Sequence, residues 1–108
     1  MVDLEFTEII MTGVKHLENW LKKNDYEKIT IDIWQAGSAD IKADSHGEKI
    51  LVQAKTIQHP NEQNRLSATD KYALKDLATR LERTPYVAYL AIDDAKNLVG
   101  EIMWERLA

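Results

Sequence analysis

The fold of this chain is decided by residues 37–56, which read GSADIKADSHGEKILVQAKT. Residues 44–48 are rich in Asp, Ser and Gly, which favour tight turns. We therefore predict a hairpin whose two strands cover residues 39–43 and 49–56. In that hairpin Asp40 lies beside Gln53, which follows it thirteen residues later. Because strand side chains alternate between faces, Gln53 and Lys55 share one face.

These three polar side chains form a candidate site. A carboxylate, an amide oxygen and a lysine at one end of two strands can hold a hard divalent cation and a phosphate. Gln53 is informative because it follows the apolar residues 50–52, and a buried amide costs free energy unless it is hydrogen-bonded. The alternatives are ordinary: Asp40 in a turn, Gln53 as a hydrogen-bonded edge-strand residue, and Lys55 as solvated surface.

The stretch from Gly37 to Lys55 resembles the PD-(D/E)xK nuclease superfamily, most closely its Mrr-type and Holliday-junction-resolvase-like branches. In these branches an Asp is followed, after about a dozen residues, by Glu-x-Lys or Gln-x-Lys. The resemblance implies a restriction-endonuclease-like fold and Mg²⁺- or Mn²⁺-dependent endonuclease cleavage of DNA. It also implies that Asp40 and Gln53 are metal ligands and that Asp40, Gln53 and Lys55 are catalytic.

The chain departs from the family pattern in two places. Ala39 stands where the family has Pro before the Asp. The first-helix acid that often completes the family's site has no direct match, because Thr7 occupies its place. Glu8 is the nearest candidate but projects away from the apolar stripe of its helix, whereas Glu18 lies nearer the edge of that stripe.

The remaining segments predict an α/β protein with the order α-β-β-β-α-β and one further element, a mixed sheet flanked by two helices. A helix over residues 4–23 carries apolar residues at helical spacing. A half-buried strand covers residues 29–34, and residues 58–65 form a loop. The stripe of the first helix comprises Phe6, Ile10, Val14, Leu17 and Leu21.

The second half of the chain predicts another helix and one or two strands. Ser67 to Asp70 resembles a capping box, so a helix is expected over residues 67–83, ending before Pro85. Residues 86–92 are almost wholly apolar, as in a strand covered on both faces. Residues 98–104 are expected to form a last strand or a short helix. The second helix is expected to bury Tyr72 or Ala73, with Leu74, Leu77, Ala78 and Leu81.

Length and composition restrict the function classes. The 108 residues suit one domain, 1–108, and the absence of cysteine excludes disulfides and thiolate metal sites. No segment is apolar enough for a signal peptide or a membrane span, so the cytoplasm is the expected location. The tryptophans, Trp20, Trp34 and Trp104, are expected in the core or at an interface.

The charge distribution bears on DNA binding. The net charge of −4 is unfavourable for a DNA-binding protein, but the excess of acids lies in residues 1–48, which hold ten acids and five Lys or Arg, against eight and nine in residues 49–108. We therefore expect any nucleic-acid contact to involve Arg65, Lys71 and Lys75. A homodimer is expected by analogy with small nucleases. Two alternatives stay open: an inactive nuclease-fold module that binds nucleic acid or protein, and a small acidic interaction or inhibitor protein.

Overall fold

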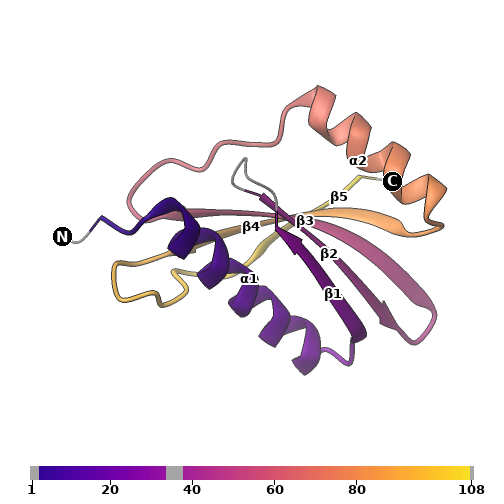
Figure 1. Ribbon diagram of the computed structural model, residues 1–108, viewed down its shortest axis with the longest axis horizontal. Helices are drawn as coiled ribbons and strands as arrows, with labels where there is room; N and C mark the ends of the chain where they lie inside the picture. The colour runs from indigo at the N-terminus through magenta and orange to yellow at the C-terminus, as the bar shows by residue number, and fades with distance from the viewer. Residues whose placement is uncertain (1–2, 34–37, 108) are drawn as a thin grey trace.

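Within residues 3–33 and 38–107, which the computed structural model describes, two helices and five strands follow the predicted order (Figure 1). The α/β class and the core order α-β-β-β-α-β are therefore confirmed. In chain order the elements are α1 Phe6–Lys23, β1 Glu27–Ile33, β2 Ser38–Ser45, β3 Glu48–Gln58, α2 Ala68–Arg80, β4 Thr84–Ile92 and β5 Met103–Arg106.

The described strands form one mixed sheet in the order β1-β2-β3-β4-β5. All neighbours are antiparallel except β3 and β4, which are parallel and are joined through α2, since a parallel pair needs a crossover connection. The predicted hairpin between β2 and β3 is present. Pairing continues to Ser45 and Glu48, so the turn needs only His46 and Gly47. Gly47 has a φ of 83°, which glycine adopts without strain.

Helix α1 covers one face of the sheet. Four of its five predicted stripe residues are buried: Ile10, Val14, Leu17 and Leu21. The inclusion of Phe6 was wrong, because this side chain is 60% exposed. Phe6 is the first residue of α1, one turn before the first buried position. The stripe packs on alternate strand residues, among them Ile41, Val52 and Leu90.

Helix α2 lies on the opposite face and has a narrower buried stripe than predicted. Ser67 caps it as expected, its hydroxyl accepting a hydrogen bond from the Asp70 backbone N–H at 3.1 Å. Leu74 and Ala78 are buried against the sheet. The expected burial of Tyr72 or Ala73 and of Leu81 was wrong, since all three are exposed. The backbone of α2 lies close to β3 and β4 alone among the described strands, and the helix ends at Arg80, so a narrow strip of it is covered.

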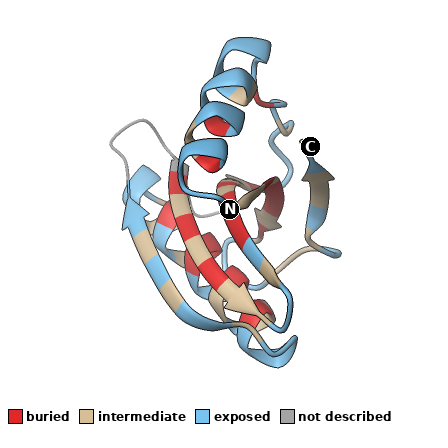
Figure 2. Ribbon diagram, turned by 90° about the vertical axis from the view of Figure 1, so that its right-hand side faces the viewer, coloured by how far each residue is buried: buried red, intermediate tan, exposed pale blue. Residues whose placement is uncertain are grey.

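Strand β4 has a continuous run of buried residues because α1 covers one face of the sheet there and α2 covers the other. Residues 87–90 are all buried, and the buried and half-buried residues of the strands are visible in Figure 2. The predicted last strand was placed too early, because β5 begins only at Met103. Leu98 forms a single bridge with Ile92, after which Gly100, with a φ of 71°, interrupts the strand. No helix within the described residues is long and apolar enough to cross a membrane.

Candidate functional site

The structure brings Asp40, Gln53 and Lys55 together on two neighbouring strands. Asp40 of β2 is the direct cross-strand partner of Gln53 of β3. Lys55 follows two residues later and pairs with Ser38, so its side chain leaves the same face as that of Gln53. All three side chains are half-buried, and Asp40 and Gln53 both have polar or electrostatic partners. The hairpin that the sequence predicted therefore gives the expected juxtaposition.

This group lies on the α2 side of the sheet. Ala39, Ile41 and Ala54 alternate with the site residues and are buried on the α1 side. On the α2 side the helix backbone lies over β3 and β4, and among the described residues no helix covers the face formed by β1 and β2. The candidate site consequently lies where the part of this face covered by α2 meets the part that no described helix covers.

Asp32 of β1 is a site residue that the sequence reasoning missed. It is the direct cross-strand partner of Asp40, so its carboxylate belongs to the same face. The two acids and Gln53 thus form one row across three strands. Like charges directly opposite each other on a sheet are destabilising, and a bound cation relieves their repulsion. The signal was the alternation of residues 29–33, because antiparallel pairing of this strand with the next one sets Asp32 beside Asp40.

Lysines flank this acidic row on both sides. Lys42 lies two residues from Asp40 on β2 and pairs with Thr30 of β1. Lys55 lies two residues from Gln53 on β3, and the next strand places Tyr89 beside it. Oxygen ligands and ammonium groups therefore lie on the same face of the sheet, two residues apart along β2 and along β3.

The first-helix acids lie elsewhere. Helix α1 packs on the opposite face, and the carboxylate of Glu8 accepts a hydrogen bond from the Glu5 backbone N–H at 3.3 Å. It also lies 3.0 Å from the ammonium of Lys96. Hydrogen bonds from Lys96 and from the Glu5 backbone lower the pKa of Glu8. Glu18 pairs with Lys22 at 3.7 Å on the same helix. The sheet thus separates both acids from Asp40 and Gln53.

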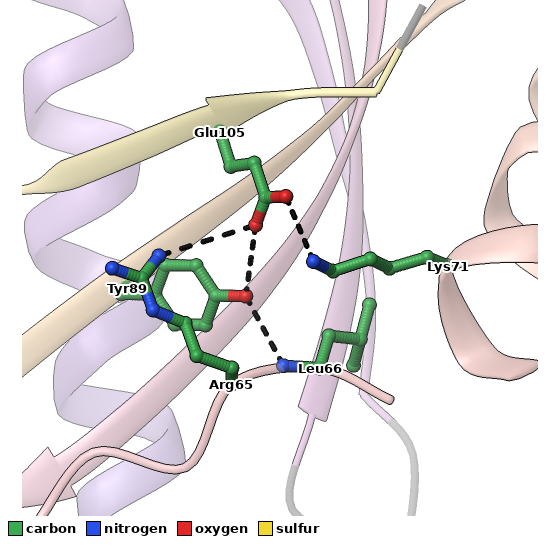
Figure 3. A network of polar contacts seen from close by, with 5 residues as sticks. All are labelled: Arg65, Leu66, Lys71, Tyr89 and Glu105. Atoms are coloured by element: carbon green, nitrogen blue, oxygen red, sulfur yellow. Dashed lines mark hydrogen bonds and ion pairs between the residues drawn. The ribbon is translucent and has the colours of Figure 1, made fainter. Parts of the chain in front are cut away.

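Two of the three cations expected to contact nucleic acid converge on Glu105 of β5 (Figure 3). The ammonium of Lys71 lies 2.8 Å from one carboxylate oxygen, and the guanidinium of Arg65 lies 4.0 Å from the other. The hydrogen bond from Lys71 is the main reason that the pKa of Glu105 is lowered. Lys75, one turn further along α2, is exposed.

Tyr89 connects this network to the candidate site. Its hydroxyl donates to Glu105 at 3.2 Å and accepts a buried hydrogen bond from the Leu66 backbone N–H at 3.1 Å. The guanidinium of Arg65 lies 4.9 Å from the centre of its ring. Because Tyr89 is also the sheet neighbour of Lys55, the segment before α2 is fixed next to the site.

The donor set restricts which ion the site can hold. Asp32, Asp40 and Gln53 offer only oxygen ligands, which suit Mg²⁺ or Mn²⁺. Within residues 3–33 and 38–107, no three His, Asp or Glu side chains gather closely enough to hold an ion by themselves. An ion here would therefore keep several waters, as Mg²⁺ commonly does.

Comparison with known proteins gives no relative: no family model matches the chain, and no curated protein matches it.

Proposed function

We propose that this protein is a metal-dependent nuclease of the PD-(D/E)xK type that hydrolyses phosphodiester bonds of DNA on the α2 side of β1, β2 and β3. The observation that carries the proposal is the register of β2 and β3, which sets Asp40 opposite Gln53 with Lys55 two residues beyond. The neighbouring carboxylate of Asp32 adds a second negative charge to the same row.

Asp32, Asp40 and Gln53 would hold Mg²⁺ or Mn²⁺ through oxygen atoms. When bound, the ion supplies charge stabilisation at the phosphate and lowers the pKa of a coordinated water. Because Gln53 replaces a carboxylate, the site attracts the ion less strongly than a site with an acid at that position. The second acid, Asp32, compensates for part of that loss.

Lys55 contributes a positive charge at the same end of the hairpin. An ammonium group there attracts a phosphate and stabilises the negative charge that develops on its oxygens during hydrolysis. Its half-buried position strengthens this effect, since interactions between charges are weaker when water surrounds them. Gln53, its neighbour on the same face, would use its amide group to orient the water that attacks the phosphorus.

Contacts to the DNA backbone would come from Arg65, Lys71 and Lys75. Glu105 neutralises part of the charge of Lys71 and Arg65, so a phosphate must compete with this carboxylate. We therefore expect weak binding that depends strongly on salt. A homodimer would let two such sites reach the two strands of a duplex.

A cleavage assay tests the proposal. Supercoiled plasmid is incubated with Mg²⁺, with Mn²⁺ or with EDTA, using the wild type, Asp40→Asn, Lys55→Ala and Lys49→Ala. Lys49 is the matched control, because it is an exposed lysine on the same strand and the same face. We expect metal-dependent nicking by the wild type and Lys49→Ala, and none by the other two. Equal nicking by all four proteins would refute the assignment.

The second candidate is an inactive nuclease-fold module that binds nucleic acid or protein. The separation of Glu8 from Asp40 favours it, as does the net charge of −4. Such a module would retain any DNA in a gel-shift assay equally well with Mg²⁺ and with EDTA, and would cleave none of it.

A further inference from the structure

Four aromatic side chains meet on the α1 side of the sheet, away from the candidate nuclease site. Trp20 comes from α1, Tyr26 from the turn after it, Tyr86 from β4 and Trp104 from β5. The ring centres of Trp20 and Trp104 are 4.9 Å apart, those of Trp20 and Tyr26 are 6.4 Å apart, and those of Tyr86 and Trp104 are 6.0 Å apart. The rings thus form an open chain in the order Tyr26, Trp20, Trp104, Tyr86.

Glu48 closes this chain into a circle. The hydroxyl of Tyr26 donates to one carboxylate oxygen at 3.1 Å, and the hydroxyl of Tyr86 donates to the other at 3.3 Å. Burial, followed by the interaction with Glu48, raises the pKa of both tyrosines. Both phenols therefore stay protonated at neutral pH, and their rings remain neutral and electron-rich on their faces.

The circle surrounds a hollow. A pocket of about 160 Å³ is lined by the four rings and by Ile50. A second hollow of about 450 Å³ shares Trp20 and Trp104 with the first and extends to Glu101. All four rings are half-buried and remain in contact with solvent. This arrangement differs from a closed core, in which such rings would be covered on every side.

We propose that this aromatic circle binds a methylated ammonium group. Aromatic faces attract cations, most strongly when the cation is partly desolvated. The carboxylate of Glu48 adds a negative charge at the rim, and Glu101 adds another in the adjoining hollow. One opposing charge, Arg106, is the cross-strand partner of Tyr86 but is exposed to solvent, where its effect is screened.

The lining favours a methylated group over an unmodified one. Trp20, Trp104 and Ile50 present carbon surfaces, which suit methyl groups but cannot accept the hydrogen bonds of a primary ammonium. Each carboxylate oxygen of Glu48 already accepts one tyrosine hydroxyl, which leaves fewer of its lone pairs for the N–H groups of a primary ammonium. The ligand class is therefore a quaternary or methylated ammonium, carried either by a small molecule or by a methylated lysine side chain.

The test titrates the protein with choline and follows the indole N–H signals of Trp20 and Trp104 by NMR. The control ligand is 3,3-dimethyl-1-butanol, which has the shape of choline without its charge. We expect choline to bind about two- to thirtyfold more tightly than this alcohol, the range expected of cation–π attraction. Equal affinities, or no shift of either indole signal with choline, would overturn the proposal.

Two variants and two peptides complete the experiment. Glu48→Gln keeps the shape of the rim and should reduce the preference for choline, leaving the alcohol unaffected. Trp104→Leu should abolish the shift of the Trp20 signal. If Trp104→Leu does not fold, the test rests on Glu48→Gln, and an unchanged preference of that variant for choline over the alcohol contradicts the proposal. Tighter binding of a trimethyllysine peptide than of choline, with its unmodified lysine counterpart bound more weakly, assigns the site to a protein partner. Binding of choline alone assigns it to a small molecule.

Discussion

Replacing Gly13 by alanine should destabilise the protein, although alanine is the better helix former. Gly13 is buried in α1, where the helix crosses β3. A Cβ atom at this position would overlap the Thr56 Oγ1 and would lie 2.7 Å from both the Cβ and the Cγ2 of Thr56. Rotation of the threonine side chain moves Oγ1 and Cγ2 but not its Cβ, so α1 itself must move away from the sheet.

The magnitude follows from two opposing terms. Alanine in place of glycine stabilises a helix interior by about 1 kcal/mol. Inserting a methyl group into a packed contact costs roughly 1–3 kcal/mol, and the upper end applies here because the backbone has to shift. The net loss is therefore about 2 kcal/mol, which in a domain of this size lowers Tm by roughly 8–16 °C.

Urea unfolding of four proteins measures this effect: the wild type, Gly13→Ala, Thr56→Ala and the double variant. Thr56→Ala removes two of the three close contacts, so the double variant should be more stable than the sum of the single effects, by at least about 0.5 kcal/mol. A Gly13→Ala variant as stable as the wild type would refute the close approach of α1 to β3.

Three further predictions concern the α2 side of the sheet and its rim. Tyr89→Phe should lower the free energy of unfolding by about 1–3 kcal/mol, because the buried Leu66 N–H loses its acceptor. A change below about 0.5 kcal/mol in urea unfolding, half the lower end of that range, would contradict the buried bond. The hydrogen bond from Arg83 holds the pKa of Asp44 below its usual range. Its stabilisation is complete above the unfolded-state pKa of about 3.9 and is lost as the pH falls below it. The wild type should therefore lose more stability than Asp44→Asn between pH 5 and pH 2, roughly the range of carboxyl titration. Thermal melts measure this loss, and equal losses in the two proteins would exclude a stabilising hydrogen bond from Arg83 to Asp44. Asp32→Asn should weaken Mn²⁺ binding in a paramagnetic resonance titration, and unchanged affinity would remove Asp32 from the site.

The sequence allowed most of the fold to be predicted, because its strongest signals are local. The hairpin was predictable because Gly47 lies in a polar turn between two segments of strand-forming residues. The cap at Ser67 was predictable because its hydroxyl serves a backbone N–H only three residues away. Burial at the ends of elements was not predictable. Phe6 and Tyr72 fit helical stripes, but how much of a helix the sheet covers depends on packing between distant segments.

The candidate site also has a part that could be predicted from local sequence and a part that depends on distant segments. Asp40 and Gln53 belong to one hairpin, so their pairing followed from the turn. The pairing of Asp32 with Asp40 required the register of a second pair of strands. The position of Glu8 depended on which face α1 covers, and the spacing of residues along the helix does not contain that information. The same holds for Glu105, which is distant from Lys71 in sequence and meets it only because β5 pairs with β4.

The most direct test of the central claim is a crystal of this protein soaked in Mn²⁺ and measured at a wavelength where manganese scatters anomalously. We expect an anomalous peak between the side chains of Asp40 and Gln53, on the face that also carries Asp32 and Lys55. Crystals of Asp40→Asn treated in the same way should lack it. A wild-type crystal with no manganese at this row, or with manganese bound only at other acids, would contradict the claim.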